Sequence, residues 1–236
     1  MKTEQYQSFK KLVSDFERYV ETCKNDELHN FLQKNNIGYS VENEVVFNTR
    51  LSSISKKDNI KFIVVGDNPG KDEQLDRNRY YLMGKAGVQM RNFFSRHDFV
   101  TDFDREVVVL NKTPFHTKST SDIKNLLKFR GLIDDSQRYM ASLAAEMHRL
   151  FRCPLWIIGF SQMKKNGIFR VFREELEKQY SSAGAELKNS LLFFKHFSYG
   201  NFSRDISEAE RVCGDKHISS LLKYTSEKNR KCFPGF

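Results

Sequence analysis

Polar residues that could carry out chemistry follow directly after short apolar runs in this sequence. The segment Gly66-Asp67-Asn68-Pro69-Gly70 follows the first run, Asn111 ends the second, and His196-Phe197-Ser198 follows the fourth. An amide can orient a water molecule or pair with a planar ligand, and a histidine can hydrogen-bond to charge that develops during a reaction. These segments therefore carry groups that could position water or read the edge of a base.

Two common catalytic motifs are absent. Gly66-x-x-x-Gly70-Lys71 has one spacer residue too few for a phosphate-binding loop, and Asp72 stands where that loop has a hydroxyl residue. Gly159-Phe160-Ser161-Gln162-Met163 lacks the second glycine of a nucleophile elbow. We therefore expect neither nucleotide binding through such a loop nor a nucleophilic serine at this position.

The elements that must position these residues are visible as four short apolar runs, 62–65, 107–110, 155–158 and 191–194. Continuous apolar runs are typical of strands buried on both faces of a parallel sheet. Helical patterns separate them, at 87–96, 136–151 and 161–180, and another follows at 206–224. The alternation predicts an α/β fold with an open, mainly parallel four-stranded sheet flanked by helices on both faces. Ligands bind beyond the carboxyl ends of such strands, where the polar segments lie.

Residues 4–34 have apolar side chains at helical spacing, with a break near Lys24-Asn25-Asp26. We therefore predict an N-terminal helical extension over residues 1–40 and an α/β domain over residues 41–236.

The composition favours a polyanionic partner. The 236 residues carry a net charge of +9, which favours nucleic acid first and an anionic membrane second, although a merely basic surface fits the charge equally well. No apolar window is long enough to span a membrane and no signal peptide is evident, so we expect an intracellular, cytoplasmic monomer without membrane contact. The cysteines form no C-x-x-C pair, and no metal or cofactor is expected; they are Cys23, Cys153, Cys213 and Cys232.

The motifs resemble those of the uracil-DNA glycosylase superfamily. Gly66-Asp67-Asn68-Pro69-Gly70 is similar to its first motif in the G-x-N-P-G form, and His196-Phe197-Ser198 is similar to its His-Pro-Ser motif. Val109-Leu110-Asn111 is similar to the strand that ends in a uracil-reading asparagine, and Gly84-Lys85-Ala86-Gly87 to the start of the helix after the pocket. The resemblance covers about residues 45–225 and implies a uracil-DNA glycosylase-like fold.

The resemblance implies a monofunctional DNA glycosylase that acts on uracil or a related damaged base flipped out of the DNA. Asn111 would pair with the base, His196 would stabilise the departing base anion, and Asn68 would place the attacking water. Tyr80 or Tyr81 would lie under the base. "Monofunctional" follows from the absence of a lysine at the motif positions, which leaves no candidate for a Schiff base.

Further roles follow from the same resemblance. Other residues of the motifs would line the substrate pocket: Gly66, Pro69, Gly70 and Ser198. A loop would wedge into the duplex through Tyr199, Asn201 and Phe202. Basic residues would contact phosphates: Lys71, Lys85, Arg91 and Arg204.

Two departures from the motifs keep other interpretations open. Phe197 replaces the proline of His-Pro-Ser, and Asp67, Asp72 and Glu73 place carboxylates beside a pocket meant for DNA. One carboxylate, with Asp67 the catalytic candidate, could activate water, or the three could repel phosphate. The alternatives are a catalytically inactive module that binds nucleic acid and an enzyme that acts on free nucleotides or nucleosides.

Overall fold

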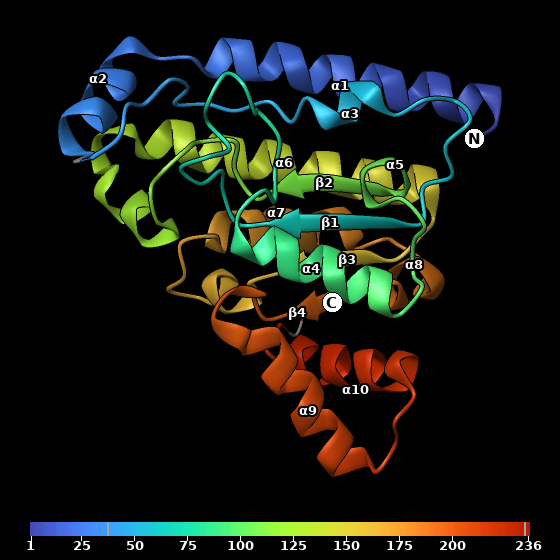
Figure 1. Ribbon diagram of the computed structural model, residues 1–236. Helices are drawn as coiled ribbons and strands as arrows, with labels where there is room; N and C mark the ends of the chain where they lie inside the picture. The colour runs from blue at the N-terminus through green and yellow to red at the C-terminus, as the bar shows by residue number, and fades with distance from the viewer. Residues whose placement is uncertain (37, 234) are drawn as a thin grey trace.

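A parallel four-stranded sheet forms the centre of the computed structural model, which describes residues 1–36, 38–233 and 235–236. The strands are β1 (Phe62–Gly66), β2 (Val107–Asn111), β3 (Leu155–Ile158) and β4 (Leu191–Phe194), in the spatial order β2-β1-β3-β4 (Figure 1). All three pairings are parallel. The predicted α/β class and open four-stranded sheet are confirmed, and the sheet is entirely rather than mainly parallel.

One face of the sheet is aromatic and is covered by α4 (Lys85–Arg96) and α9 (Asn201–Cys213). The ring of Phe94 on α4 lies 5.0 Å from Phe62 and 4.9 Å from Trp156. Phe202 on α9 lies 5.5 Å from Phe194 on β4. Because side chains alternate along a strand, these bulky rings gather on a single face and fix where the two helices sit.

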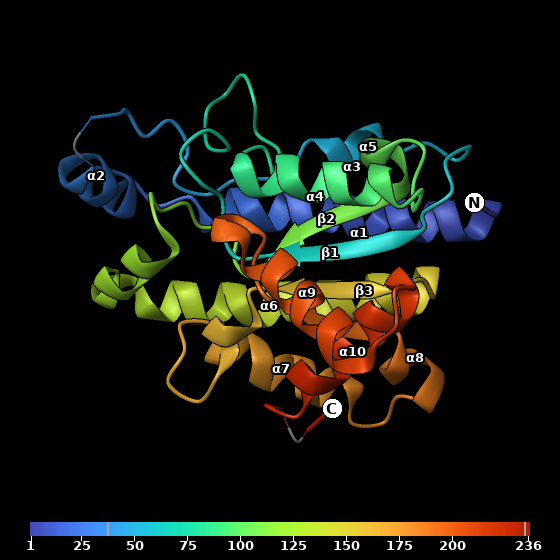
Figure 2. The same cartoon turned by 60° about the horizontal axis from the view of Figure 1, so that its bottom comes forward.

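The opposite face is covered by α6 (Arg130–Phe151), which packs against α7 (Arg170–Tyr180). Figure 2 shows α4 and α6 on opposite sides of the sheet. The edge strand β4 is covered by α10 (Ile218–Arg230). Ser226 accepts a hydrogen bond from the Phe193 amide at 3.1 Å, and Asn229 donates to the Phe193 carbonyl at 3.0 Å. The α10 side chains thus satisfy backbone groups that an edge strand would otherwise leave unpaired.

The N-terminal helical pattern forms α1 (Thr3–Cys23) and α2 (Asp26–Asn35), with the break where the sequence predicts it. Asn25 caps α2 by accepting a hydrogen bond from the Leu28 amide at 2.9 Å. Along α1, one stripe is buried in the same hydrophobic cluster as the strands: Phe9, Val13, Phe16 and Val20. The ring of Tyr19 stacks on Tyr139 of α6 at 3.7 Å, so α1 packs on a helix that itself covers the sheet.

The predicted helices have different bounds in the structure: α4 begins two residues and α6 six residues before its apolar pattern, and the other two differ more. Helix α7 begins only at Arg170, because a 3-10 turn, η3 (Phe160–Met163), and a loop through Gly167 precede it. The pattern over 206–224 divides into α9 and α10, because Gly214 at φ +64° ends α9. No helix among the described residues is long and apolar enough to cross a membrane. Shorter elements complete the fold: α3 (Arg50–Ser53), α5 (Phe103–Glu106), η1 (Thr120–Asn125), η2 (Leu127–Phe129), α8 (Ala185–Asn189) and η4 (Ser198–Gly200).

Candidate active site

The carboxyl ends of the parallel strands lie at one edge of the sheet, where Asp67, Asn111, Lys112 and His196 end or follow the strands. Asp67 follows β1, Lys112 follows β2, and His196 lies two residues after β4. The Nζ atom of Lys112 lies 2.6 Å from Oδ1 of Asp67, and the charges of both residues act on the pKa of His196. Residues from three strand ends therefore form one polar cluster, as the positions of the apolar runs predict.

Lys112 is fully buried at the base of this cluster. Its ammonium donates to Asp67 Oδ1, to the carbonyl of Gly66 at 3.3 Å and to the carbonyl of Ile158, and the ring of Phe169 lies 5.1 Å away. Burial lowers the pKa of Lys112, and Asp67 opposes that shift. Because three acceptors match the three N–H groups of an ammonium, the geometry favours the charged form.

Lys112 is a buried lysine that the motifs did not single out. The motif positions 66–70, 109–111 and 196–198 contain no lysine, but Lys112 directly follows Asn111 and contacts Asp67. However, its Nζ atom is enclosed and engaged with three acceptors, so it is not presented as a free nucleophile. The available signal was the position of Lys112 next to Asn111, two residues after the apolar run 107–110.

The carboxylate of Asp67 is held between Lys112 and the backbone of Gly159. A Cβ atom built on Gly159 would lie 2.6 Å from Oδ1 of Asp67, and Gly159 adopts φ +75°, so only glycine fits there. Lys112 bonds Oδ1 alone, and within the described residues no donor bonds the second oxygen, Oδ2. Asp67 thus combines a fixed orientation with a free acceptor, on a side chain that is 11% exposed.

Asn111 carries an unpartnered amide at the end of β2. The residue is 2% exposed, and its Nδ2 atom has no hydrogen-bond acceptor in the part of the chain that the structure describes. A Cβ atom on Gly66 would lie 2.6 Å from Asn111 Oδ1, so the amide lies against a glycine that must lack a side chain. A buried donor without a partner costs roughly 1–3 kcal/mol, which a ligand carbonyl could recover.

His196 presents a defined tautomer. The Ser198 amide donates to His196 Nδ1 at 3.2 Å, and the Ser198 hydroxyl lies 2.7 Å from the same atom. Because Nδ1 accepts, the proton of the neutral ring is on Nε2. Burial lowers the pKa of His196, Asp67 opposes this shift and Lys112 adds to it, so the ring is neutral at pH 7. The site therefore offers a neutral N–H donor.

Asn68 braces the loop that contains it. Its Nδ2 donates to Thr117 Oγ1 at 2.9 Å and to the Pro69 carbonyl at 3.2 Å, while its Oδ1 accepts from Thr120 Oγ1 at 2.9 Å. Both N–H groups are thus engaged within the protein, and only one acceptor position on Oδ1 remains for water. This leaves Asp67 better placed than Asn68 to act on a water molecule.

Two buried side chains hold the same loop from behind. His116 bonds the Pro69 carbonyl through Nδ1 at 3.0 Å and the Tyr39 hydroxyl through Nε2 at 2.9 Å, and burial lowers its pKa to about 4. Since a carbonyl only accepts, Nδ1 carries the proton. Glu73 accepts hydrogen bonds from the amides of Gly70 at 3.2 Å and Met83 at 3.1 Å. Pro69 and Gly70 therefore serve through their backbone, as parts of a clamped turn.

The two tyrosines predicted to stack on the base differ in exposure, since Tyr81 is buried and Tyr80 is partly exposed. Tyr81 is 1% exposed and donates its hydroxyl to the Val46 carbonyl at 2.5 Å, and the Arg50 guanidinium lies 4.5 Å from the Tyr80 ring centre. Instead, Leu82 packs beside Asn111, with Cδ2 3.6 Å from a Cβ atom placed on Gly66. Leu82 adopts φ +56°, a strained conformation that a leucine holds only when its surroundings impose it.

The loop expected to wedge into DNA divides into an exposed and a buried part. Tyr199 is 90% exposed and adopts φ +56°. Phe202 is 1% exposed and stacks on Phe197 at 4.0 Å, so it belongs to the aromatic core rather than to the surface. Asn201 accepts a hydrogen bond from Arg204 at 2.6 Å at the start of α9. Tyr199 is thus the member of this loop that could enter a duplex.

The residues expected to contact phosphate differ in how exposed they are. Lys71, Lys85 and Arg204 are exposed, with Lys71 Nζ 5.3 Å from the Tyr39 ring centre. Arg91 is partly buried, and its guanidinium pairs with Asp104 at 2.9 Å and lies 4.3 Å from the Phe103 ring centre. Arg91 therefore holds α4 against α5, and the three exposed residues remain available for phosphate.

Across residues 1–36, 38–233 and 235–236, no three His, Cys, Asp or Glu side chains are close enough to hold a metal ion. Comparison with protein-family models, with curated proteins and with solved structures gave no match for this chain.

Proposed function

We propose that this chain is a DNA glycosylase that hydrolyses the N-glycosidic bond of uracil or a related damaged base, on a uracil-DNA glycosylase-like fold. The observation that carries the proposal is the unpartnered, buried amide of Asn111, beside a carboxylate and a neutral histidine at one edge of the sheet. Such a set can recognise a base, stabilise its departure and activate water.

Base recognition rests on Asn111. Its amide offers one donor and one acceptor, which complement the acceptor and donor on the edge of uracil. The free Nδ2–H would donate a hydrogen bond to a base carbonyl, which removes the cost of a buried donor without an acceptor. A base that leaves this group unpaired would be disfavoured, which makes Asn111 a specificity residue as well as a binding residue.

His196 would stabilise the leaving base. As the C1′–N bond breaks, its electron pair moves to the base, which becomes an anion, and the Nε2–H of neutral His196 can donate to a carbonyl oxygen of that anion. The buried Lys112 ammonium supplies positive charge on the same side and helps keep His196 neutral. A neutral donor needs no proton transfer at this step.

Asp67 would activate the nucleophile. Its free Oδ2 can accept the proton of a water molecule whose oxygen bonds to C1′ of the oxocarbenium-like sugar, while Lys112 and Gly159 hold the carboxylate in place. Asn68 supports this arrangement by fixing the turn after Asp67 to Thr117 and Thr120. DNA would be held by the exposed cations Lys71, Lys85 and Arg204, with Tyr199 at the vacated base position.

The test uses oligonucleotides with one uracil, opposite guanine, opposite adenine or unpaired, followed by alkali to break the strand at an abasic site. Wild-type protein is expected to give breaks, and Asn111→Ala to lower the rate at least about 100-fold, since alanine cannot pair with the base. Asn92→Ala, on the exposed surface of α4, is the matched control and should retain full activity.

A second candidate is a nucleic-acid-binding module without activity. The ion pair between Asp67 and Lys112 favours it, because one oxygen of the carboxylate is already engaged by a buried ammonium. Salt-sensitive binding of the same oligonucleotides without any strand break would support the module. Breaks that Asn111→Ala leaves unchanged would contradict both the proposed site and this alternative.

A further inference from the structure

A cavity of about 480 Å³ lies between the start of α6 and the segment 165–170 that leads into α7. Some of its lining residues are neighbours in sequence of residues that contact the candidate active site. Phe169, whose ring lies under Lys112, is flanked by Ile168 and Arg170, which both line the cavity. Thr120, which bonds Asn68, begins η1, whose Ile123 and Lys124 line the cavity as well.

The floor of this cavity is apolar and held rigidly. Ile123, Leu126 and Ile133 are buried there, whereas Leu127 is 71% exposed. Gln137 fixes the base of the cavity by donating to the Ile168 carbonyl at 3.1 Å and accepting from the Phe172 amide at 3.0 Å. Gln137 of α6 therefore holds the segment 165–170 and the start of α7 in place.

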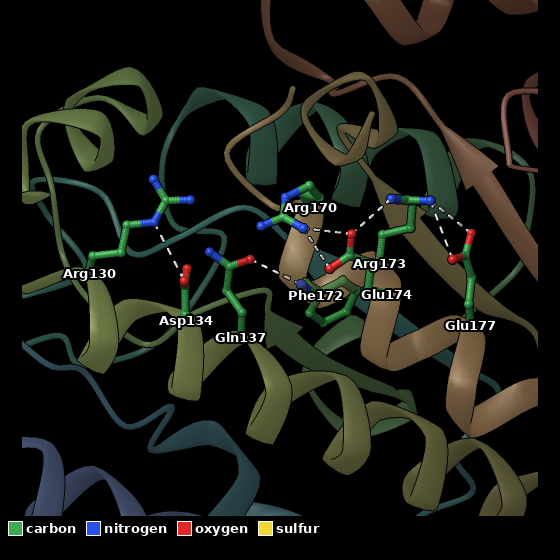
Figure 3. A network of polar contacts seen from close by, with 8 residues as sticks. All are labelled: Arg130, Asp134, Gln137, Arg170, Phe172, Arg173, Glu174 and Glu177. Carbon is green, nitrogen blue, oxygen red and sulfur yellow. Dashed lines mark hydrogen bonds and ion pairs between the residues drawn. The ribbon is translucent and has the colours of Figure 1, made fainter. Parts of the chain in front are cut away.

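The rim is strongly basic, and Figure 3 shows Arg130 and Arg170 on either side of the space. Arg130 uses only Nε to reach Asp134, at 3.5 Å, and Arg170 uses only Nη1 to reach Glu174, at 2.7 Å. Each guanidinium thus keeps further N–H donors. Lys124 and Lys165 complete the rim, and neither has an ion-pair partner in the described chain.

We propose that this cavity binds one nucleotide of the DNA strand next to the excised base, an inference that rests on the proposed function. The phosphate would lie between the guanidinium groups of Arg130 and Arg170, whose planar donor forks match phosphate oxygens. The base would lie against the apolar lining, over the buried Ile133 and beside the exposed Leu127. The volume lies within the roughly 300–1,000 Å³ of pockets that take small organic groups.

Two features favour a nucleotide of the substrate over an unrelated ligand. The chain segments that line the cavity continue into Phe169 and Thr120, which contact Lys112 and Asn68, so a DNA strand bound at the proposed site would lie near the cavity. Its lining also combines an apolar surface with four cationic side chains and one carboxylate, Asp134, which suits a group that is both planar and anionic. A single-stranded segment supplies both features in each nucleotide.

The test measures binding of a fluorescein-labelled single-stranded oligonucleotide without uracil, by anisotropy over a series of salt concentrations. The double variant Arg130→Gln/Arg170→Gln is expected to bind about tenfold more weakly, with a salt slope reduced by about 0.7 because one phosphate is no longer neutralised. Arg138→Gln is the matched control, because Arg138 also lies on α6 but pairs with Asp135 at the exposed surface. Affinity and slope equal to those of Arg138→Gln would overturn the proposal.

A second variant reports on the base. Leu127→Trp replaces an exposed side chain, so the fold should tolerate it, and the only native tryptophan, Trp156, is buried in the sheet. Oligonucleotide binding is expected to quench the introduced indole, whereas an abasic oligonucleotide of equal length should not. Equal quenching by both would show that no base reaches the floor and would overturn the proposal.

These experiments use DNA without a cleavable base, so they do not depend on catalysis. Weaker and less salt-dependent binding by the double variant, together with absence of strand breaks at uracil, would retain the nucleotide site and reject the glycosylase. Uracil excision by the wild type, with oligonucleotide binding unchanged in both cavity variants, would retain the glycosylase and reject the nucleotide site.

Discussion

The ion pair between Lys112 and Asp67 links the stability of the protein to its proposed chemistry. A fully buried ammonium is tolerated only where its charge and all three N–H groups have partners, and here two backbone carbonyls and one carboxylate provide them. The same contacts orient Asp67 and place positive charge near His196. One side chain therefore holds the ends of β1 and β3 together and determines the electrostatics of the cluster.

Lys112→Met should destabilise the protein by about 3–5 kcal/mol, because Asp67 keeps its charge but loses its counterion. Adding Asp67→Asn should recover part of this loss, since a neutral amide needs no counterion. Urea denaturation measures both effects, with Lys165→Met as the exposed control. A double variant as unstable as the sum of its single variants would show that the two groups are not coupled.

At the scale of elements, the turn after β1 is held from two directions. His116, from the segment after β2, bonds its backbone at Pro69, and Glu73 joins it to the residues that precede α4 through the amides of Gly70 and Met83. Burial raises the pKa of Glu73 to about 7, and the hydrogen bonds from these amides oppose the shift. The position of the turn should therefore depend on a carboxyl group that titrates near neutral pH.

This Glu73 shift predicts a pH-dependent stability. The unfolded chain releases the Glu73 proton near pH 4.5 and the folded chain near pH 7. Protonated Glu73 therefore adds its full contribution to the free energy of unfolding below pH 4.5, and this contribution is lost as the pH rises through 7. The loss amounts to about 3 kcal/mol. Because glutamine does not titrate, Glu73→Gln should remove this dependence of the free energy of unfolding on pH.

Urea denaturation of both proteins between pH 4.5 and 8 gives the Glu73 contribution as a difference. Buried histidines such as His116, whose folded pKa is about 4, act in the opposite direction, but they affect both proteins equally and cancel. Parallel stability curves for wild type and Glu73→Gln would contradict the prediction.

At the scale of the whole molecule, the aromatic and aliphatic core extends from α1 through the sheet to α9. The buried stripe of α1 belongs to the same cluster as the strands, and its packing reaches the sheet through α6. Helix α1 should therefore unfold together with the sheet.

Phe16→Ala tests this cooperativity. Phe16 is fully buried on α1, and its truncation should lower the free energy of unfolding by about 3–5 kcal/mol. The fluorescence of Trp156, on β3, reports on the sheet alone because it is the single tryptophan. Its transition should shift to lower urea concentration, whereas the exposed substitution Glu17→Ala should leave it in place. An unchanged transition in Phe16→Ala would mean that α1 is an independent arm.

The sequence by itself determined the strands, the break between α1 and α2, and the placement of Asp67, Asn111 and His196 at strand ends. These features follow from local patterns, since continuous apolar runs mark buried strands and polar residues directly after them must lie at one edge. Helix ends were less well determined: α7 begins nine residues later than its apolar pattern, because a 3-10 turn and a loop compete with helix there.

Only the tertiary structure decided the partners of these residues. It paired Lys112 with Asp67, buried Tyr81 and Phe202, and placed Leu82 beside Asn111. It also set the strand order β2-β1-β3-β4, which brings segments more than 40 residues apart into hydrogen-bond contact. Such contacts depend on how helices pack across both faces of the sheet. A buried charge or a strained leucine is stable only once that packing supplies its partners, so no local pattern of residues encodes it.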